Sequence, residues 1–342
     1  MILVNNPGSW TYVYAPLRHA AWNGLTPTDL VFPFFMFIMG ISTYISLCKF
    51  RFEPGKSAFV KILRRTVVIF LIGSGINWLS LALRTHSVFD FEYLRIFGVM
   101  QRLALTYGIT ALIALTVKHK YIPAIIGITL LAYFFLLLFG NGFEFSENNI
   151  VAVVDRALLG ANHLYVDSGV RLDPEGLLST IPSVCHVLIG FYCGQILVNA
   201  KTHPEKMLKL FFIGAVMSFA GFLLSYGCPL NKKIWSPTFV LVTCGLCSTL
   251  LAVLIGIVDV RKHTEWSVFF ESFGINPLFI YVFAAALSLA FDYSGFSGYL
   301  YNRVLQPSLG NYLGSLVYAL FFVTLCWLIG NRLYKQRIYI KI

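Results

Sequence analysis

The chain has 342 residues, of which 58% are hydrophobic and only 12% are charged. With a mean hydropathy of +0.75, too few charged side chains remain to cover a soluble domain of this size, which excludes an ordinary soluble enzyme, a disordered protein and a small disulfide-stabilised scaffold. The net charge of +11 does not indicate nucleic-acid binding, because the Lys and Arg residues lie between the apolar runs, where they set membrane topology. These runs are continuous and about 20 residues long, so we predict an all-α, polytopic transmembrane helix bundle rather than a membrane barrel.

About ten helices are expected, and the first is truncated. Residues 1–6 look like the last third of a spanning helix and are too short to cross a bilayer. Nine complete apolar segments follow, at 28–48, 60–83, 94–117, 121–139, 176–199, 207–226, 236–258, 267–291 and 312–331. In the segment 267–291, Gly274 and Pro277 lie close together, which predicts a broken or kinked helix that lines a cavity. We see no internal repeat and predict a single domain, 1–342.

The orientation follows from the basic residues. Most of the 26 Lys and Arg residues gather at alternate segment ends, which the positive-inside rule places in the cytoplasm together with the C-terminus. Residues 7–27 and the long segment 140–175 then lie outside the cytoplasm. A connection of this length among short ones is usually functional, so 140–175 is a candidate lid. The expected location is the bacterial plasma (inner) membrane, with the lipid bilayer as a partner and no nucleic acid.

The polar stretch 18–29 lies at the outer face, just before the first complete helix. Thr28 is the expected N-cap of that helix, with Asp29 in its first turn. Two interpretations are open. The stretch is an interfacial anchor with Trp22 at the headgroups, or it is catalytic, with His19 as a general base or acyl acceptor that Asp29 orients.

Two arginines mark the outer start of the segment 94–117. Arg102 lies about 10 Å further along the helix than Arg95. An arginine in hydrocarbon is costly and normally faces a partner or a cavity. Arg102 therefore either pairs with an acidic residue such as Asp29 or Asp292, or binds an anion such as a phosphate or carboxylate.

Acidic residues open the segment 176–199. Asp173 and Glu175 suit a helix N-terminus, and as an acidic pair at an outer mouth they also suit an amino or hydroxyl group of a substrate. His163 lies in the same outer segment. No P-loop, GxSxG or HExxH motif is present, and no Cys and His spacing suits zinc, so we expect no metal.

Short motifs that run in order over essentially the whole chain resemble one known family. They comprise residues 3–6, 18–26, 29–33, 95–96, 98–99, 101–103, 155–156, 163–165, 173–176, 231–232, 235, 333–335 and 341–342. Each motif alone is weak, but together they are similar to the transmembrane heparan-alpha-glucosaminide N-acetyltransferases and their bacterial homologues.

The resemblance implies an activity and its residues. The family transfers acetyl from cytosolic acetyl-CoA to the amino group of a terminal glucosamine across the membrane, and its members are often dimers. The catalytic histidine of its His-Ala-x-Trp-Asn-Gly motif is His19 here, and the asparagine implicated beside it is Asn5. The complete first helix and the large lumenal domain of the lysosomal enzyme have no counterpart in this sequence. We therefore expect a misplaced start codon or a clipped protein, and the acceptor stays open.

The chemistry of this transfer assigns further residues. An amine attacks a thioester only when neutral, so His19 takes its proton or accepts the acetyl group first, while Asn5 stabilises the oxyanion. Arg102 and Asn276 are expected to line the passage for the pantetheine arm. The sugar is expected to contact Trp22, Asn23, His163, Asp173 and Glu175. For the CoA phosphates we expect a basic cluster, which alternatively serves topology alone: Lys49, Arg51, Lys56, Lys61, Arg64 and Arg65.

Two other functions fit the same features. A broken helix and buried polar residues also suit an amino-sugar transporter or permease, although the lack of an internal repeat weighs against it. A non-catalytic membrane partner of another acyltransferase is the third interpretation. Uptake without acetyl-CoA would identify a transporter, and a chain that binds no CoA would favour the partner.

Overall fold

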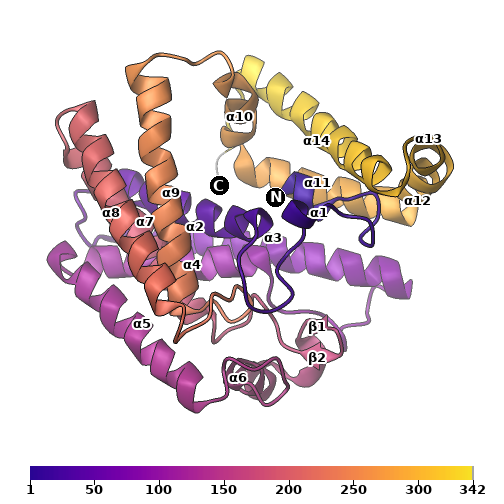
Figure 1. Ribbon diagram of the computed structural model, residues 1–342, viewed down its shortest axis with the longest axis horizontal. Helices are drawn as coiled ribbons and strands as arrows, with labels where there is room; N and C mark the ends of the chain where they lie inside the picture. The colour runs from indigo at the N-terminus through magenta and orange to yellow at the C-terminus, as the bar shows by residue number, and fades with distance from the viewer. Residues whose placement is uncertain (341–342) are drawn as a thin grey trace.

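The computed structural model describes residues 1–340 and is almost entirely helical, so the matched positions 341–342 lie outside the described residues (Figure 1). Within 1–340, eight helices are long and apolar enough to cross a membrane, or nine if one bent pair counts as a single span. The predicted class, a polytopic helix bundle, is confirmed.

One group of helices has α7 (Thr180–Asn199) as its central member. The others are α2 (Pro27–Cys48), α3 (Lys56–Thr85), α4 (Val99–Thr116), α5 (Ile122–Phe139), α8 (His203–Leu224) and α9 (Pro237–Ile255). The helices α2 and α7 pack closely because Gly40 and Gly190 face one another's backbones, and a Cβ at either position would collide with a carbonyl oxygen of the other helix. The antiparallel pair α8 and α9 stands to one side (Figure 1).

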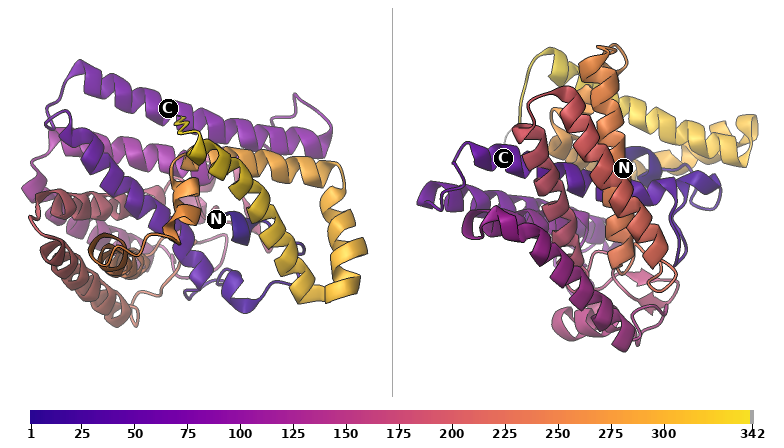
Figure 2. Two further views of the ribbon diagram at one scale, coloured as in Figure 1. Left: turned by 90° about the horizontal axis from the view of Figure 1, so that it is seen from above. Right: turned by 60° about the vertical axis from the view of Figure 1, so that its left-hand side comes forward.

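A second group holds the C-terminal helices and α1 (Ile2–Asn5), which packs on α14. It comprises α10 (Ser267–Gly274), α11 (Pro277–Tyr293), α12 (Phe296–Tyr299), α13 (Gln306–Leu309) and α14 (Asn311–Lys335). The predicted break is confirmed, since α10 and α11 are bent by 83°. The long helix α3 runs beside α11 and connects the two groups (Figure 2).

Helix boundaries differ from the predictions at two places. The segments 94–117 and 176–199 become helical only at Val99 and Thr180, because residues 94–98 and 176–179 form loops with their own contacts. The segment 140–175 is folded: it contains α6 (Ile150–Leu159) and an antiparallel pair of short strands, β1 (Val166–Asp167) and β2 (Val170–Arg171). The loop before α4 and the segment 140–175 supply one side of the site described below.

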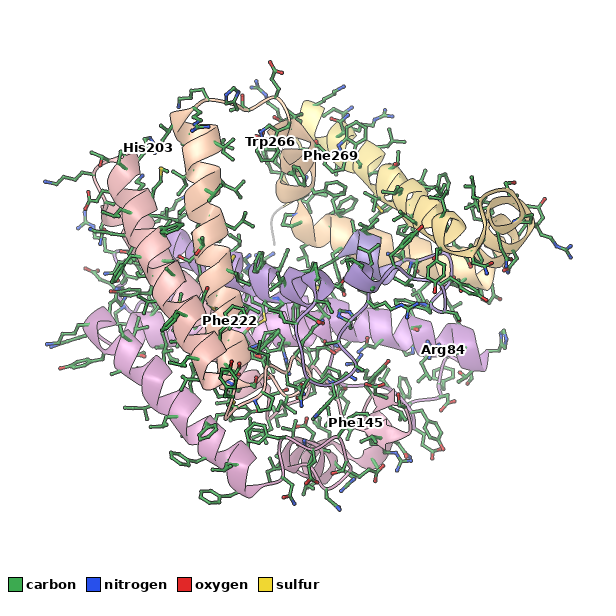
Figure 3. The ribbon with its side chains drawn as sticks, in the orientation of Figure 1. Arg84, Phe145, His203, Phe222, Trp266 and Phe269 are labelled. Atoms are coloured by element: carbon green, nitrogen blue, oxygen red, sulfur yellow. The ribbon has the colours of Figure 1, made fainter. Side chains whose placement is uncertain are left out.

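The outer surface of the bundle is apolar where lipid is expected. Large apolar side chains such as Phe222 on α8 and Phe269 on α10 are 46% and 41% exposed (Figure 3). A soluble protein rarely exposes so much apolar area, whereas a membrane-spanning one presents it to hydrocarbon.

Candidate active site

The start of α2 fixes the position of Asp29, the last residue of the polar stretch 18–29. Thr26 is the N-cap: its hydroxyl accepts from Asp29 N at 3.4 Å, and Asp29 Oδ2 accepts from Thr26 N at 3.2 Å, which forms a capping box. The predicted N-cap, Thr28, is wrong, because its hydroxyl donates to the carbonyl of Pro16 instead. Asp29 is in the first turn as predicted and is only 1% exposed.

Asp29 contacts His19 directly. The distance from His19 Nδ1 to Asp29 Oδ1 is 2.6 Å, and Asp29 Oδ2 also accepts from Ala20 N at 3.0 Å. A carboxylate only accepts hydrogen bonds, so in the neutral imidazole the proton is on Nδ1 and the lone pair is on Nε2. The His19 side chain is 45% exposed. The structure therefore combines an accessible imidazole with a buried carboxylate that fixes its tautomer.

A cavity of about 280 Å³ opens beside His19. Its walls come from the stretch 18–29, from the loop before α4, from the segment 140–175 and from the loop before α9. The lining residues are His19, Ala20, Trp22, Asp29, Arg95, Tyr165, Pro174, Glu175, Lys232 and Lys233. Trp22, predicted to contact the sugar, lines this cavity and donates its Nε1–H to the carbonyl of Phe143 at 2.8 Å.

Arg95 organises another part of the cavity wall. Its Nε and Nη2 donate to Asp173 at 2.8 and 2.5 Å, and Nη2 also donates to Glu175 at 2.7 Å. Burial opposes the charged form of Arg95, but Asp173 and then Glu175 outweigh this and raise the pKa of its guanidinium. Burial likewise opposes ionisation of Glu175, yet Arg95 and then Arg102 hold the pKa of its carboxyl below the usual value.

The two predicted acidic residues differ in what they can do. Asp173 is fully buried, and besides Arg95 it accepts from the backbone amides of Tyr165 and Glu175. It therefore builds the wall and lies outside the cavity lining. Glu175 lines the cavity, and within residues 1–340 its ion-pair partner is Arg95. Of the predicted acidic pair, Glu175 is thus the residue placed to contact a substrate.

Arg102 is fully buried and faces the loop before α7. Its Nη2 donates to the carbonyl of Gly176 at 3.0 Å and to the hydroxyl of Ser179, and its guanidinium lies 5.0 Å from the ring centroid of Trp235. The predicted pairing with Asp29 or Asp292 is wrong, because Arg102 turns toward the loop that opens α7. It does not line the His19 cavity.

The loop before α9 provides residues that the sequence analysis did not assign to the site. Asn231 is fully buried; its Oδ1 accepts from the amides of Lys233 and Ile234, and its Nδ2 donates to Asn23 Oδ1 at 3.1 Å. Asn23, predicted to contact the sugar, thus bridges two loops. Lys232 lies with Nζ 3.2 Å from His19 Nδ1 and 3.7 Å from Asp29 Oδ1. The only earlier signal was the match at residues 231–232.

Two other predicted residues lie outside this cavity. Asn5 lines a separate cavity of about 250 Å³ together with Asn77 and Tyr281. The Nδ1 of His163 bonds to the carbonyl of Leu94 at 2.7 Å, which ties the segment 140–175 to the loop before α4. The structure therefore does not bring Asn5 and His163 together with His19 in one cavity.

The residues predicted for the CoA donor are also apart from His19. The helix α2 has 22 residues, so its two ends lie about 33 Å apart. The predicted basic cluster lies at the end of α2 that is distant from His19, in the loop 49–55 and in the first turns of α3. Within it, Arg65 lies with its guanidinium 4.7 Å from the ring centroid of Tyr107. Asn276 lies at the α10–α11 break, where its Nδ2 donates to Ile338 O and its Oδ1 accepts from Ile340 N, both at 2.8 Å.

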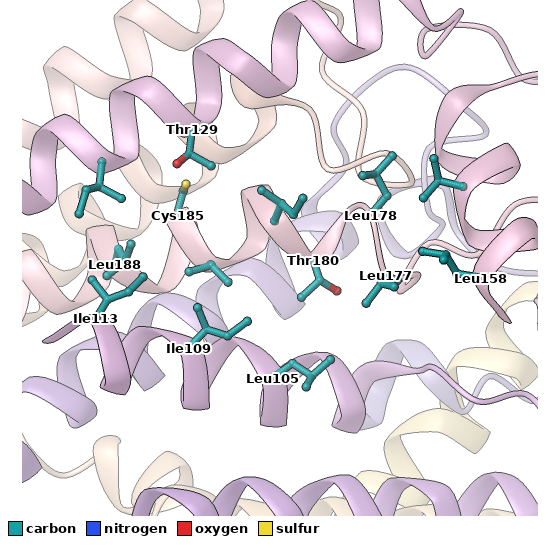
Figure 4. Close-up of a pocket in the computed structure, with 14 residues that line it drawn as sticks. Leu105, Ile109, Ile113, Thr129, Leu158, Leu177, Leu178, Thr180, Cys185 and Leu188 are labelled. Carbon is teal, nitrogen blue, oxygen red and sulfur yellow. The ribbon is translucent and has the colours of Figure 1, made fainter. Parts of the chain in front are cut away.

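A larger groove lies between α4, α5 and α7, away from His19 (Figure 4). Its volume is about 540 Å³, and side chains such as Leu105, Ile109 and Leu188 line it. The polar groups on its walls are hydroxyls and the Cys185 thiol, so it offers neither a general base nor an ion-binding group. Size therefore does not identify the site, and the smaller polar cavity at His19 is the candidate active site.

No model of a protein family matches the chain. The chain is similar to heparan-alpha-glucosaminide N-acetyltransferase from Mus musculus, with 28% identity, and to that from Homo sapiens, with 29% identity. Each match covers 82% of this chain and 50% of the relative, so the chain spans about half the length of the curated relatives it matches. These similarities confirm, at the level of the family, the resemblance to the heparan-alpha-glucosaminide N-acetyltransferases that the sequence motifs indicated.

Proposed function

We propose that this protein is a membrane-bound acetyltransferase that moves acetyl from cytosolic acetyl-CoA to the amino group of a glucosamine-type sugar on the other side of the membrane. The observation that carries this proposal is the His19–Asp29 pair, 2.6 Å apart, at the mouth of a polar cavity. The names of the similar proteins support the same chemistry.

His19 serves as the base. Its Nδ1–H is held by Asp29, so Nε2 has a free lone pair that removes a proton from the acceptor amine as nitrogen attacks the thioester carbonyl. The new C–N bond forms, the C–S bond breaks, and the CoA thiolate departs. A route in which Nε2 first accepts the acetyl group uses the same geometry.

Glu175 and Trp22 form the acceptor side of the cavity in this proposal. A carboxylate attracts an amino sugar, and the flat face of an indole packs against the apolar face of a sugar ring. The distant cluster of Lys49, Arg51 and Arg64 supplies the positive charge for the CoA phosphates, on the cytoplasmic side. The donor then extends along the bundle toward His19.

The test is acetyl transfer from radiolabelled acetyl-CoA to glucosamine by the purified protein in detergent. We expect transfer by the wild type and a loss of at least about 100-fold in His19→Ala, the usual scale of a general base. A matched control is His263→Ala, at an exposed histidine after α9. A folded His19→Ala protein that acetylates at the wild-type rate would falsify the role of His19.

A further inference from the structure

Three cationic side chains line the His19 cavity, and two of them are committed to structure. Arg95 pairs with Asp173 and Glu175. Lys233 pairs with Asp167, donates to the carbonyl of Ala21 and lies over the ring of Phe145. Their hydrogen-bonding groups hold the walls together, so neither is free to exchange a proton with a substrate.

Lys232 differs from both. Its ammonium lies 3.2 Å from His19 Nδ1 and 3.7 Å from Asp29 Oδ1. Because Nδ1 already donates to Asp29, it has no lone pair for a second donor, and the Lys232 ammonium keeps N–H bonds for other acceptors. Asn231, whose side chain caps the amides of the next two residues, holds this lysine beside the imidazole.

We propose that Lys232 is the general acid that protonates the departing CoA thiolate, as the counterpart of His19, which deprotonates the acceptor amine. This inference rests on the proposed function of the same cavity. It assigns a catalytic role to a residue outside the His19 motif.

The two proton transfers balance. Nitrogen of the neutral amine bonds to the acetyl carbon and its N–H proton goes to His19 Nε2, while the C–S bond breaks and sulfur takes a proton from Lys232 Nζ. The products are the N-acetyl sugar and free CoA thiol. The enzyme is left with imidazolium and neutral amine, and proton exchange through water in the cavity restores imidazole and ammonium. No oxidant, reductant or metal is required.

The surroundings of Lys232 suit an acid. An ordinary lysine ammonium, with a pKa of about 10.4, holds its proton more tightly than a thiol with a pKa near 8.5. Burial lowers the pKa of the Lys232 amine, and the carboxylates of Glu175 and Asp29 offset this only in part. Arg102 adds positive charge nearby. A buried ammonium in this field gives up its proton more readily than an exposed one.

Two donors with different leaving groups test the assignment. Acetyl-CoA releases an alkyl thiolate that needs a proton, whereas S-phenyl thioacetate releases an aryl thiolate that leaves without one. We expect Lys232→Met to lower kcat about 100-fold with acetyl-CoA and to retain kcat within about tenfold with S-phenyl thioacetate. Lys232→Arg keeps the charge but cannot give up its proton, so it should show the same pattern. The rate measured with His19→Ala is subtracted for each donor, to remove transfer that does not depend on the catalytic base.

Lys233→Met is the matched control. Whatever it does to the overall rate, it should change kcat with both donors by the same factor. Thermal unfolding of each purified variant shows that the comparison concerns folded protein. The pH profile gives a second readout: wild-type kcat with acetyl-CoA should fall on the alkaline side as Lys232 loses its proton, and Lys232→Met should lack that limb.

Equal losses with both donors in Lys232→Met, together with full activity of Lys232→Arg, would overturn the inference and leave Lys232 as a purely electrostatic group. A wild type that transfers acetyl while Lys232→Met keeps full kcat with acetyl-CoA would overturn it as well. If the wild type transfers from neither donor, the proposed function itself fails, and the inference fails with it.

Discussion

The charged residues at the two ends of α2 differ in sign and in burial. At the His19 end, Asp29 is buried and both of its oxygens accept hydrogen bonds. At the other end, Lys49, Arg51 and Arg64 are exposed, and none of them takes part in an ion pair found among residues 1–340. A buried charge needs hydrogen-bond or ion-pair partners within the folded protein, whereas exposed cations are available to bind an anion from solution.

The backbone differs in the same way. The His19 end is fixed by a capping box and by the bridge between Asn23 and Asn231. At the far end, Arg51 and Phe52 both adopt left-handed φ angles, near 53° and 55°, and Phe52 packs against the ring of His119. A preorganised site suits chemistry, and a tight turn that presents cations outward suits capture of a phosphate.

Asp29→Asn tests the preorganised His19 end of α2 and should have the largest effect. The amide still fills the space but no longer carries the charge that holds His19 Nδ1–H. We expect kcat for acetyl transfer to fall about 100-fold or more. Asp292→Asn, at an exposed aspartate that accepts from Ser297, is the control. Unchanged kcat in a folded Asp29→Asn protein would show that the pair does not orient the base.

The pH dependence of stability measures the cost of burying a second carboxyl group, that of Asp155. Burial raises the pKa of Asp155 from 3.8 to about 6, so the folded state favours its neutral form. The contribution to stability is complete below pH 4 and is lost as the pH rises to about 6, with an expected size of about 3 kcal/mol. Thermal unfolding across this range should show a slope in the wild type that is smaller in Asp155→Asn, and equal slopes would contradict the assignment.

The turn at Gly176 tests how tightly the cavity wall is built. A Cβ there would collide with Asp155 Oδ2, and the carbonyl of Gly176 accepts from Arg102. We expect Gly176→Ala to lower stability by about 2 kcal/mol and to reduce kcat as well. Gly169→Ala, in the β1–β2 turn with nothing nearby, is a poor control because its φ is +87°. Gly75, in α3 with open space around it, is the better one.

At the basic end, we expect the triple variant Lys49→Gln, Arg51→Gln and Arg64→Gln to raise KM for acetyl-CoA about tenfold, as loss of roughly 1.4 kcal/mol of phosphate attraction predicts. Because the chemistry lies elsewhere, kcat should change little. The charge-matched control is Lys201→Gln, Lys206→Gln and Arg261→Gln. An equal rise in KM in both triple variants would indicate general charge rather than a site.

The smallest expected effect concerns Asn276. Its amide holds the backbone of Ile338 and Ile340, so Asn276→Ala should lower the unfolding free energy by about 1–2 kcal/mol. A higher KM for acetyl-CoA without any loss of stability would instead support the predicted place in the donor passage. Asn276→Asp keeps the bond from Ile340 N but turns a carboxylate oxygen toward Ile338 O in a nearly buried site, so it should lower the unfolding free energy at least as much as Asn276→Ala.

The sequence predicts the spanning helices well because apolar runs of about 20 residues have few other interpretations. It places two helix starts too early, since residues 94–98 and 176–179 are apolar enough to resemble helix yet are held in loops by Arg95, Asn77 and Arg102. The same tertiary contacts decide that Arg95, rather than Arg102, faces the cavity. Pattern alone cannot show this, because both arginines lie at the start of one apolar run.

Within the site, one of the two interpretations of the stretch 18–29 has Asp29 orient His19, and the structure brings these two side chains into contact. Lys232 was not assigned, because a lysine in a short polar loop has the same appearance whether it faces water or a cavity. Only the contact between the loop before α9 and the stretch 18–29, more than 200 residues away, places it beside the imidazole.

The most direct test of the central claim uses sealed proteoliposomes with protein in one orientation. Acetyl-CoA is enclosed on the side of the basic cluster, and glucosamine is supplied on the side of His19. We predict that N-acetylglucosamine appears on the His19 side with the wild type and not with His19→Ala. Product that forms only when donor and acceptor share one side, or glucosamine uptake without acetylation, would contradict the account.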